Sequence, residues 1–355
     1  MNSKLQVSAS PHTRGMMTTG KIMALVLAAL MPACLVGVLA FGAHALMVLI
    51  FSTASAVAAE YVYEKLLNRP VTVTDGSAAV TGLLIGMNMP PQIDLWIPCL
   101  GSVFAIVVIK QLYGGIGKNF MNPALGARCF LLISFAGKMT TFQSGSGLLR
   151  ITETIPDAAD ALSGATPLAY LKTGALYDLK ALFFGTVPGC IGEVSAAALL
   201  LGGIFLLAMK VIRIRIPGTY LGCFAVLTLI TALARGYESP LLYTLQQLSA
   251  GGLMLGAWFM ATDYVTSPIT ARGQLVFGCA LGVLTWVFRM IGSGAEGVSY
   301  SIIFMNLLVP VIERYTRPVA AGMVRQNREN RRLMRKKRRE ARRLKAAGGK
   351  KEKDA

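Results

Sequence analysis

The sequence has few charged residues for its length. Only 15% of its 355 residues are Asp, Glu, Lys or Arg, whereas 54% are hydrophobic, and the mean hydropathy is +0.57. A soluble globule of this size needs a larger share of polar side chains to cover its surface. The composition therefore argues against a soluble protein and indicates that most of the chain lies in a lipid bilayer.

Residues that bind metals are also scarce. The sequence has two histidines, His12 and His44, and no Cys-x-x-Cys pair. Its six cysteines stand singly in apolar surroundings: Cys34, Cys99, Cys129, Cys190, Cys223 and Cys279. Isolated cysteines of this kind usually pack as small buried hydrophobic residues. We therefore expect no iron-sulfur cluster, zinc or other metal site in this chain.

Apolar runs long enough to cross a bilayer recur throughout the sequence. A spanning helix needs about 20 apolar residues, and the runs show no strand-like alternation. The first run is long and begins after about twenty residues, so it predicts a retained anchor, not a cleaved signal peptide. The runs predict an all-α integral membrane protein with ten helices near 22–41, 45–63, 77–89, 94–112, 122–136, 192–212, 217–235, 242–262, 274–290 and 298–313.

The ten predicted helices form two groups of five around a polar interruption. A shift of 178 residues superposes Pro90 on Pro268 and Gly114 on Gly292. Because five is odd, the two groups would enter the membrane from opposite sides, as in the inverted repeats of many transport proteins. The predicted organisation is an amino-terminal segment 1–21, a first repeat 22–136, a loop 137–191, a second repeat 192–316 and a tail 317–355.

The basic residues predict the orientation of the helices. Cytoplasmic ends of membrane helices carry more Lys and Arg than external ends. With the amino terminus inside, the inner segments hold Lys4, Arg14, Lys21, Lys65, Arg69, Lys118, Lys210, Arg213, Arg215 and Arg272, whereas Arg235 and Arg289 lie at external edges. We therefore expect a protein of the cell membrane with both termini cytoplasmic and the 137–191 loop outside.

Most of the net charge of +18 lies in the tail. Residues 317–355 carry sixteen basic and four acidic side chains. Such a run predicts contact with anionic lipid headgroups or a cytoplasmic partner. A nucleic-acid role is disfavoured because no aromatic residues or binding fold accompany the charge.

The predicted external loop contains the one motif with specific chemistry, Asp160-Ala161-Leu162-Ser163-Gly164-Ala165-Thr166. A phosphoester needs a hydroxyl group, which Thr166 offers, and Gly164 and Ala165 leave room for an enzyme to approach. Without further context the stretch reads as an ordinary turn. It resembles the target sequence of flavin transferases, which attach FMN through its phosphate to the last Thr. The resemblance implies covalent FMN on Thr166, with Asp160 and Ser163 as parts of the recognised motif.

Further segments extend the resemblance over nearly the whole chain. Gly114–Ala124, Phe259–Pro268, Glu296–Tyr300 and Met305-Asn306 are similar to the RnfD/NqrB family, and most similar to the D subunit of the Rnf complex. The resemblance implies a flavoprotein subunit that is not catalytic alone. Its six-subunit translocase, with subunits A, B, C, E and G as partners, would couple electron transfer between ferredoxin and NAD to sodium or proton movement. A second, noncovalent flavin is a further expectation.

Two nucleotide-binding patterns fail at the Gly-rich segment. A phosphate-binding P-loop would need Gly where Leu112 stands and Ser or Thr at Asn119, and the dinucleotide fingerprint would need Gly at Phe120. A helix break is the better interpretation.

Acidic residues at membrane depth are costly and point to ion paths. We place the predicted ion path near Asp263 and Glu296, at helix breaks of the second repeat. Asp94 and Glu193 open predicted helices. Each of these four acids is alternatively an interfacial or helix-capping acid.

Three other functions remain open at this point. The chain could be the B subunit of a sodium-translocating NADH:quinone reductase, which shares the same plan. The inverted repeat and broken helices alone would also fit a secondary transporter or channel for a small solute. A membrane scaffold with an accidental Ser-Gly-Ala-Thr loop is the third. Flavin fluorescence that survives denaturation distinguishes the flavoprotein from the last two.

Overall fold

The computed structural model describes residues 17–142, 167–172, 176–185, 187–292, 297–318 and 333–334. Every regular element within these ranges is helical, which confirms the all-α class. Five helices are long and apolar enough to cross a membrane: α1 (Thr19–Phe41), α2 (Ala43–Leu66), α10 (Arg215–Ala234), α13 (Ala271–Met290) and α14 (Gly297–Thr316). The described chain therefore has the form of a multi-pass membrane protein.

Shorter apolar helices account for four of the other predicted spans. They are α3 (Ser77–Met87), α4 (Trp96–Phe104) with its π-helical continuation η2 (Ala105–Gln111), α5 (Pro123–Ser134) and α9 (Ala196–Ala208). Short elements complete the described fold: η1 (Val73–Asp75), α6 (Ala136–Met139), α7 (Pro167–Lys172) and α8 (Leu179–Phe184).

The range 242–262, predicted as one helix, is divided into three pieces. They are α11 (Pro240–Ser249), α12 (Leu253–Leu255) and the π-helical η3 (Gly256–Met260). Ala250 is extended, and Gly251 has φ +65°, a conformation that glycine adopts without steric cost. The prediction of a continuous helix is therefore wrong here, because the chain turns at the Ala250-Gly251-Gly252 segment.

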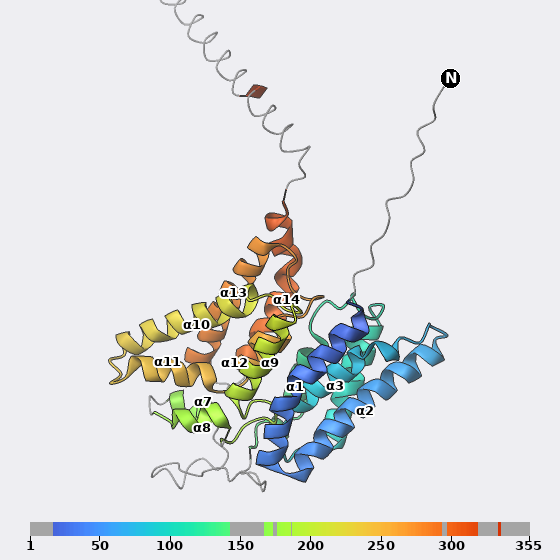
Figure 1. The fold of residues 1–355 in the computed structure, drawn as a ribbon, viewed down its shortest axis with the longest axis horizontal. Coiled ribbons are helices and arrows are strands. Elements are labelled where there is room, and N and C mark those ends of the chain that lie inside the picture. Colours follow the sequence, from blue (N-terminus) through green and yellow to red (C-terminus); the bar gives the residue numbers. More distant parts are fainter. Residues whose placement is uncertain are drawn as a thin grey trace, which may run out of the picture.

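The two halves of the chain lie side by side (Figure 1). The first half, drawn from blue to teal, holds α2 packed on α3 and α4. The second half, drawn from yellow-green to red, holds α10 packed on α13, and α13 on α14. Contacts between the halves include α1 with α9 and α5 with α14. These are the first and last helices of each predicted repeat; the predicted domain limits themselves stay a prediction.

In the first half, α3 ends and α5 begins inside the bundle. The backbone N–H and C=O groups at such helix ends need hydrogen-bond partners. Behind the end of α3, Gly192 N–H donates to Met87 O (2.7 Å) and Ile191 N–H donates to Met89 O (3.1 Å). At the start of α5, Asn122 Oδ1 accepts from the N–H groups of the two residues after Pro123. Residues just before α9 therefore donate the hydrogen bonds that satisfy carbonyl groups at the end of α3.

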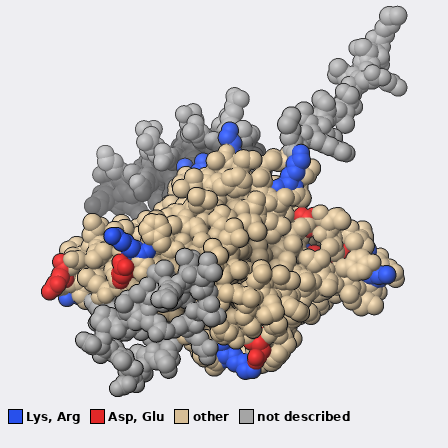
Figure 2. Space-filling model, turned by 60° about the horizontal axis from the view of Figure 1, so that its bottom comes forward, with Lys and Arg blue, Asp and Glu red and all other residues tan. Residues whose placement is uncertain are grey.

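Many large apolar side chains face outward on the long helices. Examples with more than half of their surface exposed are Leu35, Ile50, Val226, Ile230, Leu233 and Phe304. Figure 2 shows that most of the described surface seen in that view is neither acidic nor basic. Within a bilayer such surface contacts lipid tails, so its exposure costs little there.

Candidate functional site

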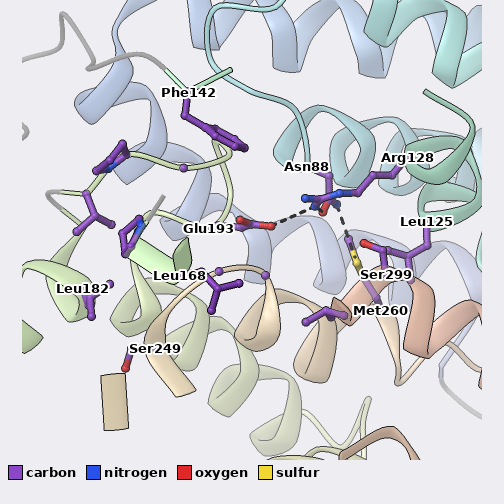
Figure 3. Close-up of a pocket in the computed structure, with 17 residues that line it drawn as sticks. Asn88, Leu125, Arg128, Phe142, Leu168, Leu182, Glu193, Ser249, Met260 and Ser299 are labelled. Carbon is purple, nitrogen blue, oxygen red and sulfur yellow. Dashed lines mark hydrogen bonds and ion pairs between the residues drawn. The ribbon is translucent and has the colours of Figure 1, made fainter. Parts of the chain in front are cut away.

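A cavity of about 650 Å³ lies where the two halves meet the segment 167–193 (Figure 3). We call it the outer cavity, because one wall comes from the loop that the charge pattern predicts to be external. Its walls are mostly apolar, and three polar side chains gather at one end. Its lining includes Asn88, Leu125, Arg128, Phe142, Pro167, Leu168, Leu182, Val187, Glu193 and Met260.

Arg128 is the charged centre of this cavity. It lies on α5 and is buried, with 4% of its surface exposed. Its Nη1 donates to Asn88 Oδ1 and to Glu193 Oε1, the latter at 3.1 Å, and its Nη2 lies 3.6 Å from Cys190 Sγ. Three separate segments of the chain therefore meet at one guanidinium group.

Glu193 is held against both halves of the protein. Its side chain is 11% exposed and forms the ion pair with Arg128. A Cβ atom added to Gly252 would lie 2.6 Å from Glu193 Oε1, so the absence of a side chain there makes room for the carboxylate. Glu193 does not cap α9, because the Ser195 side chain caps that helix by accepting from Ala198 N–H. The capping alternative for Glu193 is therefore wrong.

Asn88, Asn122 and Met260 form a polar cluster at the outer cavity. Asn88 Nδ2 donates to Leu84 O (2.6 Å) and lies 3.9 Å from Met260 Sδ. Asn122 Nδ2 donates to Met260 O (3.2 Å). Asn88 and Met260 line the outer cavity, whereas Asn122 lines a second cavity. The ends of α3, η3 and α5 thus connect the linings of the two cavities.

The second cavity, which we call the inner cavity, has a volume of about 830 Å³. Its polar lining includes Ser77, Lys110, Asn119, Asn122 and Asp263, and the rest is largely apolar. The Asp263 carboxylate accepts from Thr266 Oγ1 (3.0 Å) and Val265 N–H (3.4 Å). Asp263 therefore lies at the break between η3 and α13, as predicted, and also lines this cavity.

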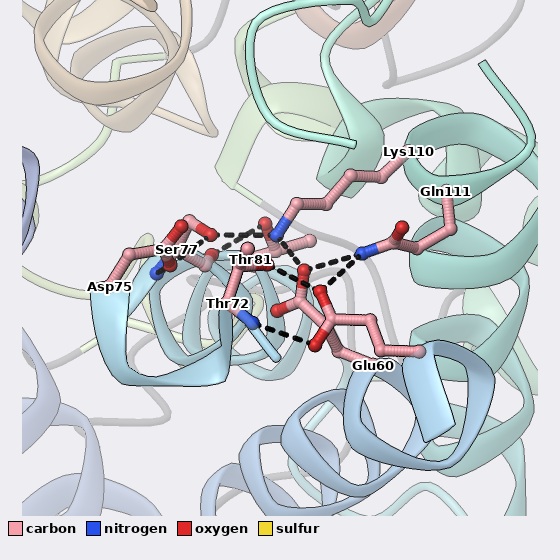
Figure 4. Close-up of polar contacts among 8 residues, drawn as sticks. Glu60, Thr72, Asp75, Ser77, Thr81, Lys110 and Gln111 are labelled. Atoms are coloured by element: carbon pink, nitrogen blue, oxygen red, sulfur yellow. Dashed lines mark hydrogen bonds and ion pairs between the residues drawn. The ribbon is translucent and has the colours of Figure 1, made fainter. Parts of the chain in front are cut away.

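A buried charged cluster stands beside the inner cavity (Figure 4). Lys110 Nζ lies 2.5 Å from Glu60 Oε1 and donates to Ser77 Oγ (2.6 Å). Gln111 Nε2 donates to Glu60 Oε1 (2.7 Å) and Glu64 Oε1 (3.4 Å). All four side chains of Glu60, Glu64, Lys110 and Gln111 are at most 3% exposed. The cluster ties α2 to η2 and the start of α3.

Sequence reasoning missed this cluster and Arg128. The available signals were Glu60 and Glu64, one helical turn apart in an apolar run, and single cations at Lys110 and Arg128 in other apolar runs. Buried charges in such runs are usually paired. The pairing itself joins residues about 50 or more positions apart and needs the fold.

The predicted flavin motif, Asp160, Ser163, Gly164, Ala165 and Thr166, lies outside the described residues, as does Glu296. The residue after Thr166, Pro167, begins α7 and lines the outer cavity. Asp94 forms an exposed ion pair with Lys138. His44 Nδ1 lies 2.8 Å from Pro91 O, and the described residues contain no group of three or more His, Cys, Asp or Glu that could hold a metal.

Comparisons with known proteins agree over most of the chain. Residues 6–322 match the model of the NQR2, RnfD, RnfE family. The chain is 44% identical to the D subunit of the Na⁺-translocating ferredoxin:NAD⁺ oxidoreductase complex of Acetobacterium woodii, over 92% of this chain and 98% of that one. It is 42% identical to the D subunit of the proton-translocating complex of Clostridium ljungdahlii, over 89% and 96% of the two chains.

A third relative is the D subunit of the ion-translocating oxidoreductase complex of Stutzerimonas stutzeri. The identity is 40%, over 85% of this chain and 92% of the relative. The match thus includes both halves, the loop between them and the residues of both cavities. The chain belongs to the NQR2, RnfD, RnfE family.

Proposed function

We propose that this chain is the D subunit of an ion-translocating ferredoxin:NAD⁺ oxidoreductase complex of the cell membrane. The full-length similarity to D subunits of such complexes carries this proposal. The chain would work with subunits A, B, C, E and G and would not be catalytic alone. The names of the relatives specify both sodium and protons, so they do not choose between the two ions.

We further propose that FMN is joined through its phosphate to Thr166 by a flavin transferase. The observation that supports this attachment is the position of Pro167, which directly follows Thr166 in the sequence and lines the outer cavity. A tether on the preceding residue would hold a flavin ring within reach of that cavity. Attachment on the external side agrees with the charge pattern of the loops.

The residues of the outer cavity fit a flavin ring by their chemistry. The ring has an apolar end and a polar, hydrogen-bonding end, and the cavity likewise combines apolar walls with Asn88, Arg128 and Glu193 at one end. When bound, the flavin supplies the capacity to accept and pass on electrons.

The protein would supply position and charge. The Arg128 guanidinium would stabilise negative charge that develops on a reduced ring, because it is buried and faces the cavity. Glu193 would hold the guanidinium in place and oppose part of its charge. The apolar walls formed by Leu125, Phe142 and Leu182 would exclude water and so strengthen these interactions.

The other functions are less well supported. The three relatives named above are D subunits of ion-translocating oxidoreductase complexes, which favours this reading over a quinone reductase subunit, a solute transporter and a scaffold. The expected second, noncovalent flavin remains a proposal, and the inner cavity is the place that we assign to it.

The attachment can be tested at Thr166 in the complete complex. We expect Thr166→Ala to abolish flavin fluorescence of the denatured chain, because no hydroxyl remains, while the chain still enters the membrane. Thr166→Ser keeps a hydroxyl and should retain partial attachment. Mass analysis of the wild-type peptide should show the mass of FMN less one water. A flavin retained in full by Thr166→Val would show that another residue carries it.

A further inference from the structure

A third cavity of about 810 Å³ opens between two loops of the second half. One loop joins α9 to α10 and contributes Lys210 and Arg213; the other follows η3 and contributes Tyr264 and Ser267, and Gln274 lines the cavity from α13. We call it the headgroup pocket. By the charge pattern of the sequence, both loops lie at the cytoplasmic ends of their helices.

Two cations line this pocket without acidic partners. Lys210 and Arg213 are exposed, and neither side chain forms an ion pair or hydrogen bond with another described residue. No Asp or Glu is among the residues that line the pocket. Two acids lie nearby: Asp263 accepts its two hydrogen bonds from its own loop, whereas Glu313 accepts from the Ile269 N–H (3.1 Å) and pairs with Arg317. The pocket therefore presents two cations that pair with no described acid, at helix ends that the charge pattern predicts to be cytoplasmic.

The backbone at Lys210 is unusual for a residue with a side chain. Its φ is +56°, a left-handed conformation that glycine or asparagine normally takes after a helix. The Lys210 N–H donates to Leu207 O and the Val211 N–H to Leu206 O, so the turn closes α9. A lysine in this place costs conformational energy that a glycine would not. Strain of this kind is frequently kept where a side chain has a function.

Gln274 adds a buried acceptor to the pocket. Its Nε2 donates to Pro268 O (3.2 Å), whereas its buried Oε1 has no hydrogen-bond partner. A buried amide oxygen without a partner is costly, because it has lost its hydrogen bonds to water without gaining others. A ligand with both a negative charge and a hydroxyl group would satisfy the two cations and this oxygen together.

The surroundings of the pocket match a lipid and not a soluble anion. Ile214, Tyr264 and Ile269 beside it are each more than half exposed, at 54%, 54% and 78%. Apolar side chains at the edge of a basic pocket can contact acyl chains while the cations hold the headgroup. From the cations, the unpartnered oxygen and this rim, we propose that the pocket binds the headgroup of one anionic phospholipid with a hydroxyl-bearing headgroup.

A bound lipid would reinforce an existing contact between the two loops. The Tyr264 hydroxyl already donates to Val211 O, which links the loop after η3 to the loop before α10. Val211, Thr262 and Tyr264 line both the headgroup pocket and the inner cavity. The bound lipid would therefore stabilise the wall of the inner cavity that these three residues form. This site is separate from the basic tail and does not depend on the proposed flavin.

The test uses the full-length chain in its complex, freed of native lipid and placed in phosphatidylcholine nanodiscs with increasing phosphatidylglycerol. Native mass spectrometry then counts the phosphatidylglycerol retained. We expect one tightly held molecule per chain, and Lys210→Gln/Arg213→Gln should weaken its binding by roughly 30-fold, from about 1 kcal/mol for each cation. Gln274→Glu, which places a negative charge in the pocket, should also weaken it.

The matched control is Arg215→Gln/Arg272→Gln, which removes two exposed cations from the same end of the helices but outside the pocket. Retained binding in this control together with loss in the first pair supports the site. Equal loss in both pairs would mean nonspecific attraction and overturn it, as would unchanged binding in all variants. Complete displacement by millimolar inorganic phosphate would overturn the lipid assignment in favour of a soluble anion.

Discussion

At the scale of single residues, the opposing charges of Arg128 and Glu193 give a test of the outer cavity. If the flavin ring lies there, Arg128→Gln leaves a net negative charge beside it and should lower its midpoint potential. Glu193→Gln leaves a net positive charge and should raise it. A charge-assisted contact of about 1.5 kcal/mol or more corresponds to roughly 60 mV for a one-electron couple. Redox titration of the purified complex by absorbance measures both shifts.

The double variant Arg128→Gln/Glu193→Gln serves as the control, because the pair is then neutral again and the potential should lie between those of the single variants. The exposed Lys138→Gln should leave the potential unchanged, since Lys138 pairs with Asp94 at the surface. If the midpoint potential shifted in the same direction in both single variants, the substitutions would have disturbed the structure of the site generally. That result would contradict a flavin beside this pair.

The buried ion pair of Lys110 and Glu60 gives a second test at single residues, this time of stability. Lys110→Met leaves the Glu60 carboxylate buried without its cation, and breaking a buried pair in this way costs about 3 to 5 kcal/mol. We expect a large fall in the thermal unfolding temperature of the detergent-purified chain. Lys110→Met/Glu60→Gln should recover much of the loss, whereas exposed Lys65→Met should change little. A double variant no better than the single one would contradict this account.

At the scale of elements, the contact of α1 with α9 depends on the absence of side chains. A Cβ atom on Gly202 would lie 2.1 Å from Ala29 O, which no small shift relieves. Gly202→Ala should therefore push the two helices apart and lower stability. Gly222→Ala, on α10 with no atom near its Cβ, should be neutral or slightly stabilising. Thermal unfolding and gel filtration of the two variants in parallel measure the difference, and equal behaviour would refute the close-packing argument.

The helices also show which parts of the fold could be predicted from the sequence. The long spans were predictable because runs such as Thr19–Phe41 and Arg215–Ala234 are apolar over a full membrane thickness. The short helices were also predicted, but their ends were not, because tertiary partners set them: residues before α9 donate to the carbonyl groups of Met87 and Met89 at the end of α3. Likewise, Asp263 was identified from its position at a break, but its place in the inner cavity depends on α1, α3 and α5.

At the scale of the whole molecule, hydrogen-bonded residues from both halves of the chain connect the linings of two cavities. Asn88 and Met260 face the outer cavity, and Asn122, which donates to Met260 O, faces the inner one. Pro167, the residue after the predicted flavin motif, borders the first cavity, and Asp263 borders the second. An electron carrier at one cavity and a charge that attracts cations at the other would thus lie within one bundle.

This arrangement leads to a prediction about coupling, which rests on the proposed function. If the ion path passes the break that holds Asp263, neutralising this acid should slow ion uptake more than flavin reduction, because the carboxylate would attract the cation but take no part in electron transfer. Glu296→Gln, at the other predicted position, should act in the same direction. The measurement is the ratio of ions moved to electrons transferred by the complex in proteoliposomes.

Asp94→Asn is the matched control for these two variants, because Asp94 is an exposed acid paired with Lys138 and borders neither cavity. We expect the ratio to fall for Asp263→Asn and to stay constant for Asp94→Asn. A normal ratio for both Asp263→Asn and Glu296→Gln would make these acids structural. In that case the hydrogen bonds from Thr266 Oγ1 and Val265 N–H to Asp263 would be its whole role, namely to close the turn before α13.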